Sequence, residues 1–171
     1  MSKPVFIISA PVDTYSGYGA RSRDIVKSII ELDKYDVKIL PQRWGDTPTG
    51  FMDDHSNWSF LKPLCIPNLT AKPDIWMQIT IPSEFQPVGN YNIGCTAGIE
   101  STGCASSWID GLNKMDLNLV SSEHSKKVFT DIRSEQKDRQ TNQVVNIIKL
   151  EKPIEVIFEG VDLDTYFYKK P

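Results

Sequence analysis

Residues 4–32, PVFIISAPVDTYSGYGARSRDIVKSIIEL, decide the class of fold that this chain adopts. Residues 5–9 are a continuous apolar run, which is typical of a parallel strand buried on both faces. After a polar gap, apolar residues recur at helical spacing over residues 25–32, with charged residues between them. A second strand is predicted around residues 37–40, and it stops at a proline. Residues 4–41 are therefore predicted to form a β-α-β unit.

Strand and helix patterns continue to alternate along the rest of the chain. Residues 43–64 carry a weak pattern that predicts loop and a short helix, and residues 134–143 contain no apolar residue, which predicts an exposed loop or helix end. Further strands are predicted within 72–80, 91–98, 116–122 and 154–158, and helices within 106–115 and 122–133. This order predicts an α/β fold, a Rossmann-like three-layer domain with a mainly parallel sheet over residues 1–160.

The composition is that of an ordinary globular protein. The 171 residues include 40% hydrophobic residues and carry a formal net charge of -3, which argues against a general nucleic-acid binder. No apolar run approaches the ~20 residues that span a bilayer, and the N-terminal run is too short for a signal peptide. We therefore expect no transmembrane segment and a cytoplasmic location. The three cysteines are odd in number, so we expect free thiols.

Gly17 and Gly19 stand where the first strand turns into the first helix. Such a turn directs backbone N–H groups and the positive end of the helix at one spot, which suits a phosphate or another anion. The alternative is a tight turn whose glycines serve only backbone geometry. The dinucleotide fingerprint G-x-G-x-x-G is broken by Ser22, and no P-loop triplet occurs, so both interpretations of the glycine pair stay open.

Three segments resemble glycosyltransferases of the two-domain GT-B fold, particularly the retaining group that includes family 4. YSGYGARSRDIVKSI, residues 15–29, resembles their first glycine loop and helix, with Ser16 in place of the first glycine of Gly-Gly-x-Gly. DLNLVSSEHSKKVF, residues 116–129, resembles the strand and helix at the cleft wall. PIEVIFEGVDLDTYF, residues 153–167, is similar to the Ile-Pro-Asn-Gly-Val-Asp-x-x-x-Phe segment that leaves the first domain, although Phe158 and Glu159 replace Pro-Asn.

The resemblance covers only the first half of such an enzyme. It implies an N-terminal, acceptor-side domain that helps move a sugar from a nucleotide-sugar donor to an unknown acceptor, with residues 161–171 as the start of an interdomain linker. The chain alone is then expected to be inactive, and to need a C-terminal domain or a partner chain. No cofactor is expected, and we expect no metal, because nothing recognised in the sequence requires one. The resemblance places Gly17 and Gly19 at the donor diphosphate, and the possible acceptor side at Glu100, Ser101, Thr102, His124 and Arg21.

Other interpretations compete with these assignments. The whole chain could be a non-catalytic α/β binding module. The Ser and Thr residues after Glu100 could merely cap a helix that begins near Ser106. Arg21 and Arg23 could approach a phosphate or lie on a solvated helix face. Any of the four tryptophans could stack on a sugar, although Trp76 lies in an apolar strand and is expected in the core.

Two expectations concern chemistry directly. His124 lies beside serines and Glu123, but residues within one helical turn do not form a Ser-His-acid triad, so a hydrolase is not expected. A Gly19→Val variant of a completed enzyme is expected to lose turnover and keep its fold, on the view that Gly19 takes a positive φ and lies against the diphosphate.

Overall fold

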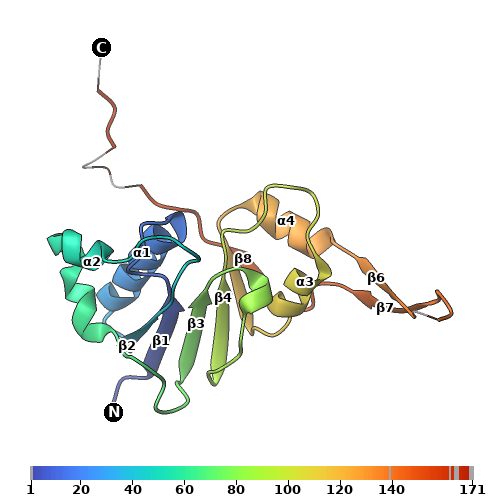
Figure 1. The fold of residues 1–171 in the computed structure, drawn as a ribbon, viewed down its shortest axis with the longest axis horizontal. Coiled ribbons are helices and arrows are strands. Elements are labelled where there is room, and N and C mark those ends of the chain that lie inside the picture. Colours follow the sequence, from blue (N-terminus) through green and yellow to red (C-terminus); the bar gives the residue numbers. More distant parts are fainter. Residues whose placement is uncertain (1, 139, 162, 164–165, 170–171) are drawn as a thin grey trace.

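The computed structural model describes residues 2–138, 140–161, 163 and 166–169, and its centre is a six-stranded sheet (Figure 1). The strand order is β2-β1-β3-β4-β5-β8, and every neighbouring pair is parallel. The strands are β1 Val5–Ala10, β2 Asp36–Pro41, β3 Ile75–Ile79, β4 Tyr91–Cys95, β5 Leu117–Val120 and β8 Ile154–Val156. The predicted α/β fold with a mainly parallel sheet is confirmed.

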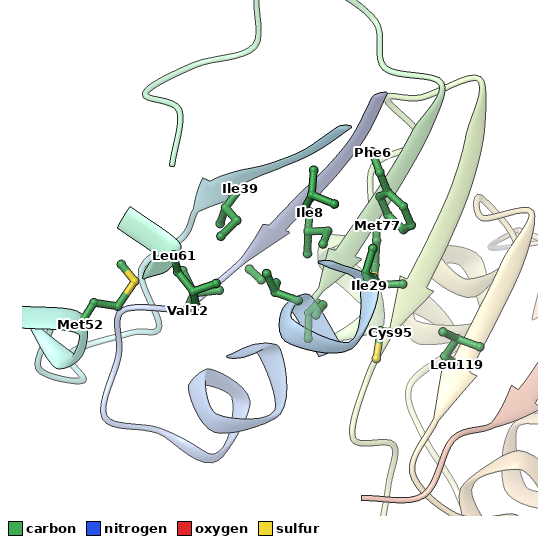
Figure 2. Packing of buried hydrophobic residues seen from close by; sticks show 14 residues of the cluster. Phe6, Ile8, Val12, Ile29, Ile39, Met52, Leu61, Met77, Cys95 and Leu119 are labelled. Atoms are coloured by element: carbon green, nitrogen blue, oxygen red, sulfur yellow. The ribbon is translucent and has the colours of Figure 1, made fainter. Parts of the chain in front are cut away.

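Helices cover both faces of the sheet, because successive strand residues point to opposite faces. Ile8 and Met77 belong to the core on one face, shown in Figure 2, whereas Ile7 and Trp76 belong to the core on the other. The first face is covered by α1 Gly17–Glu31, α2 Phe51–Asp54 and the 3-10 helix η1 Ser56–Leu64. The second is covered by the 3-10 helix η2 Pro82–Glu84, α3 Ser106–Leu112 and α4 Glu123–Asp131. The domain therefore has three layers, and Trp76 is in the core as predicted.

A buried arginine holds the loop between β1 and α1. Arg23 is only 4% exposed and donates hydrogen bonds of 2.8 Å to the Val12 carbonyl and 3.0 Å to the Thr14 carbonyl. Its guanidinium carbon lies 3.4 Å from the centroid of the Phe51 ring, a cation–π contact that also ties α2 to α1. Arg23 was expected either to approach a phosphate or to lie on a solvated helix face. Both expectations are wrong, because its guanidinium is buried and donates its hydrogen bonds to loop carbonyls.

Residues 134–143 differ from the prediction. Those that the structure describes are mostly exposed as expected, but residues 134–137 form β6 Ser134–Lys137, which pairs antiparallel with β7 Val144–Ile148. This hairpin extends away from the body of the domain (Figure 1). Its polar first strand carries no apolar alternation, since neither face of that strand is buried, and the pattern therefore could not reveal it. Strand β8 is also shorter than predicted, ending at Val156, and Phe158 is 67% exposed.

The cysteines, the membrane question and the C-terminal segment compare with the sequence predictions as follows. Cys65, Cys95 and Cys104 are free thiols. In the described part of the chain no helix has the length and apolarity needed to cross a membrane. The predicted linker at 161–171 falls partly outside the described residues, and the described ones that are large and apolar are exposed, namely Val161, Leu163, Tyr166, Phe167 and Tyr168.

Candidate functional site

The strand order creates a switch point between β1 and β3. Strand β1 leads into α1 on one face of the sheet, whereas β3 leads through η2 to Phe85, which packs on the other face. Where loops diverge to opposite faces at the carboxyl ends of parallel strands, a crevice opens that commonly binds ligands. A ligand site is therefore expected at the carboxyl edge of the sheet, between β1 and β3.

A cavity of about 200 Å³, the inner cavity, lies at this switch point. The first turn of α1 opens into it with Gly17, Tyr18 and Arg21, and the ends of β3 and β4 form its floor with Ile79 and Cys95. The remaining walls come from the loop after β2, the loop after β4 and the segment after β8, with Trp44, Thr96, Ala97 and Glu159. The first helix turn and the strand ends thus meet around one cavity.

The two glycines of the loop have different roles. Gly17 is exposed, lines the inner cavity, and would leave open space around an added Cβ. Gly19 is buried, and an added Cβ would lie 2.7 Å from the Thr14 hydroxyl and closer still to the Thr14 carbonyl oxygen. Its N–H already donates to the Oγ of the N-cap, Ser16. Gly19 is therefore required for packing against the preceding loop.

The expected positive φ at Gly19 is wrong. Gly19 lies within α1, and the glycines with positive φ in the described chain are Gly45, Gly50 and Gly98. Glycine is selected at position 19 because no side chain fits between the helix and the loop that enters it. A Val at this position would clash with that loop, so the expectation that Gly19→Val keeps the fold intact is overturned as well.

An aromatic pair forms one wall of the inner cavity. The rings of Tyr18 and Trp44 are stacked, with centroids 4.1 Å apart and an interplanar angle of 23°. The Tyr18 hydroxyl is 3.0 Å from the Thr96 hydroxyl and accepts a hydrogen bond of 3.2 Å from the Ala97 N–H. These contacts lock the phenol between the loop after β2 and the loop after β4, so the wall is rigid.

The Arg21 side chain lines the inner cavity and reaches the segment that follows β8. Its guanidinium donates to the carbonyls of Ile157 and Phe158, the latter at 3.0 Å, and lies 4.0 Å from the Glu159 carboxylate. The solvated-face alternative for Arg21 is therefore wrong, because its side chain is only 14% exposed. Burial raises the pKa of the neighbouring Cys95 thiol to about 11, so this cysteine is a neutral, unreactive part of the floor.

A second cavity of about 310 Å³, the serine cavity, lies at the ends of β4 and β5. It shares Ala97 and Glu159 with the inner cavity, and its walls include Glu100, His124 and three serines, Ser121, Ser122 and Ser125. Two residues predicted for an acceptor side, Glu100 and His124, are thus brought together. The two cavities therefore adjoin each other along the edge of the sheet.

The remaining predicted site residues lie around the serine cavity. Thr102 lines another hollow together with His124, and Ser101 donates a hydrogen bond of 2.7 Å to the Gly103 carbonyl. Helix α3 begins at Ser106 as predicted, but its N-cap is Ala105 and no side chain caps it. The capping alternative for the hydroxyls after Glu100 is therefore not supported. By contrast, Ser122 is the N-cap of α4 and accepts from the Ser125 N–H.

Sequence reasoning missed three residues of the inner cavity. Tyr18 lies between the two glycines, and its aromatic ring at the start of a helix was a signal that could have been used. Trp44 was one of four tryptophans, and nothing in the local sequence separated it from the others. Glu159 is 138 positions from Arg21 in the chain, and only the parallel pairing of β8 with β5 brings it to the site.

In the described part of the chain, no cluster of three or more His, Cys, Asp or Glu side chains could hold a metal ion. The triplet at residues 162–164 has the form Asp-x-Asp, and both aspartates lie outside the described residues. The expectation of no metal therefore stays a prediction.

In comparisons with known proteins, no family model, curated protein or solved structure matches the chain significantly.

Proposed function

We propose that this chain is the N-terminal, acceptor-side domain of a GT-B glycosyltransferase, which transfers a sugar from a nucleotide-sugar donor to an acceptor. The observation that carries the proposal is the inner cavity, which lies at the switch point of a parallel sheet and receives the first turn of α1. The N–H groups of the first helical positions have no partner within a helix, and here they belong to Gly17 and Tyr18. These amides and the helix dipole suit a diphosphate.

In this proposal the two cavities have different roles, with the leaving group in the inner cavity and the acceptor in the serine cavity. When the bond between the sugar and the diphosphate breaks, negative charge grows on the leaving nucleotide, and donors at the N-terminus of α1 stabilise that charge. The acceptor oxygen bonds to the anomeric carbon and gives up its proton. The serine cavity has three titratable side chains, of which Glu159 faces the Arg21 guanidinium. The other two, Glu100 and His124, could receive this proton, directly or through water.

An exposed apolar segment supports the second domain that the proposal requires. Seven large apolar residues between positions 157 and 168 are 45–82% exposed, beginning with Ile157 and Phe158 beside the inner cavity. A concentration of exposed large apolar side chains in one short segment commonly marks an interface. We propose that a second Rossmann-like domain, in the same polypeptide or in a partner chain, covers this segment and holds the nucleotide base and ribose of the donor.

The proposal can be tested on the isolated chain by amide NMR. A helix end contributes roughly 0.3–1 kcal/mol to an exposed anion, so donor binding is expected to be weak, with a dissociation constant of about 1 mM or weaker. Titration with UDP, UDP-glucose or GDP-mannose is expected to shift the Gly17 and Tyr18 amide signals, whereas uridine, which lacks phosphate, leaves them in place. Micromolar donor binding, or shifts that avoid these two amides, would overturn the proposed donor site.

The rival function is a binding module without catalysis. Adding a separately produced nucleotide-binding domain distinguishes the two, because only a transferase domain is expected to restore donor consumption. Binding of donor with no turnover in any such mixture would favour the module.

A further inference from the structure

Trp44 also borders a separate pocket on the outside of the domain. This outer pocket has a volume of about 390 Å³, and Arg43, Asp46 and Glu84 are among its walls. Tyr18 stacks on the Trp44 indole and lines the inner cavity, and Trp44 lines both the inner cavity and the outer pocket. Trp44 therefore stands between the proposed donor site and the outer pocket.

The loop that carries Trp44 is held in place. The Gln42 N–H donates a hydrogen bond of 2.9 Å to the Ala10 carbonyl, which ties the start of the loop to the end of β1. A turn follows, closed by a hydrogen bond of 3.0 Å from the Thr47 N–H to the Trp44 carbonyl, with Gly45 at a φ of 51°. Because the loop is ordered before any ligand arrives, binding to the indole would cost little conformational entropy.

Polar side chains of the outer pocket, close to the Trp44 indole, keep hydrogen-bonding groups that could bind a ligand. Within the described residues, neither the Arg43 nor the Asp46 side chain makes a hydrogen bond or ion pair, and they lie one and two positions from Trp44 in the chain. Glu84 accepts a hydrogen bond from the Thr80 hydroxyl through Oε2, which orients the carboxylate and leaves Oε1 for a ligand. The pocket therefore offers a guanidinium donor and two carboxylate acceptors around an aromatic surface.

We infer that the outer pocket is a saccharide subsite, in which a pyranose ring stacks on Trp44 and its hydroxyls bond to Asp46, Glu84 and Arg43. One face of a pyranose presents C–H groups that pack on an aromatic ring, and its rim presents hydroxyls that donate to carboxylates and accept from a guanidinium. A nucleotide fits less well, since two carboxylates against one guanidinium give the pocket a net negative charge that repels phosphate.

The inference rests on the proposed function, because it makes the acceptor a carbohydrate. The outer pocket and the serine cavity share no lining residue, so the ring in the outer pocket is a remote unit of the acceptor and not the ring that reacts at the serine cavity. The two can fail separately. Donor binding is read at the Gly17 and Tyr18 amides, whereas saccharide binding is read at the Trp44 indole N–H and the Asp46 amide. A shift at one pair of signals without the other would show which of the two proposals is wrong.

The test is titration of the full chain with methyl glycosides of glucose, galactose, mannose and N-acetylglucosamine, each up to about 100 mM, because a single-ring subsite is expected to bind only in the millimolar range. At least one glycoside is expected to shift the Trp44 indole and Asp46 signals. Trp44→Ala is expected to weaken that binding about tenfold or more, and Trp44→Phe, which keeps an aromatic face, about threefold or less.

Two further variants distinguish loss of saccharide binding from disturbance of the fold in Trp44→Ala. Asp46→Asn on the exposed turn is expected to weaken binding about two- to tenfold with unchanged thermal unfolding, since it removes one charged acceptor. Trp108→Phe serves as the matched control, because that indole packs against Phe129 on the other face of the sheet. Saccharide affinity of this control is expected to equal that of the unmodified chain.

Several results would overturn the saccharide subsite. These are no shift at Trp44 with any of the four glycosides, equal affinity in the Trp44→Ala and unmodified chains, or a shift at Trp44 with UMP but with no glycoside. The last result would assign the pocket to a nucleobase instead.

Discussion

The guanidinium of Arg21 donates a hydrogen bond of 3.0 Å to the carbonyl of Phe158, which lies 137 positions later in the chain. It also donates to the Ile157 carbonyl and faces the Glu159 carboxylate at 4.0 Å. One side chain of α1 therefore holds the segment after β8 across the inner cavity. The position of that segment, and with it the exposed apolar surface, depends on Arg21.

Replacing Arg21 is expected to release this segment. Arg21→Met keeps the length of the side chain but removes the donors, so the amides of residues 157–159 are expected to exchange faster with solvent while those of β1 are unchanged. The loss of stability is expected to be about 1–2 kcal/mol, less than two hydrogen bonds to a charged donor contribute in a buried site, because the released carbonyls can bond to water instead. Hydrogen exchange with mass spectrometry measures the first effect and urea unfolding the second.

The control for this variant is Arg133→Met, because Arg133 is exposed and, among the residues that the structure describes, bonds to carbonyls of its own turn alone, those of Thr130 and Ile132. Unchanged exchange at residues 157–159 in Arg21→Met would show that other contacts, such as the 2.9 Å bond from the Ile157 N–H to the Val120 carbonyl, hold the segment by themselves.

Gly17 and Gly19 are expected to respond very differently to alanine. Gly19→Ala should cost about 1–3 kcal/mol, since the new Cβ would lie 2.7 Å from the Thr14 hydroxyl and 3.0 Å from the Pro11 carbonyl oxygen. Gly17→Ala meets no atom within 4 Å and removes a glycine from a helix, so it should leave stability unchanged or raise it by up to about 1 kcal/mol. Chemical denaturation of both variants tests the contrast, which equal stabilities would refute.

The buried Arg23 is expected to be structurally essential. Arg23→Met leaves the Val12 and Thr14 carbonyls without their donor in a buried site, which is expected to cost about 1–3 kcal/mol. Burial lowers the pKa of Arg23, but an arginine stays charged across the ordinary pH range, so the cost is expected to be independent of pH between about 5 and 9. The exposed Lys27→Met is the control, and a loss of similar size in both variants would contradict this role.

Cys95 predicts how stability changes at alkaline pH. Burial raises the pKa of its thiol from 9.0 to about 11, so the folded state holds the proton more tightly than the unfolded state does. The resulting stabilisation is complete below pH 9 and is lost as the pH rises to about 11. Cys95→Ala is expected to flatten this part of the stability profile, measured by urea unfolding at pH 8 to 11.

The same burial predicts an order of thiol labelling. Cys65 and Cys104 are partly exposed, whereas Cys95 is 2% exposed. Iodoacetamide at pH 8 is expected to modify the first two before Cys95, as peptide mass spectrometry would show. Labelling of Cys95 at the rate of Cys104 would mean that the floor of the inner cavity opens in solution.

Most of the fold could be predicted because its signals are local. The apolar runs of β1 and β3 and the helical spacing of α1 each lie within one element, and burial on both faces of a parallel sheet leaves a continuous apolar pattern. The hairpin of β6 and β7 escaped detection, since β6 packs against nothing that would demand an apolar face.

The candidate site could be predicted only in part. The sequence by itself determined that a glycine-containing turn joins the first strand to the first helix, because a strand period, two glycines and a helical period follow one another directly. It also determined that Glu100 follows a strand at the carboxyl edge of the sheet. Tertiary structure alone decided that Gly19 serves packing and that Arg21 spans the cavity to Phe158. It alone also selected Trp44 from four tryptophans, because these contacts depend on the spatial order of strands, which no local period encodes.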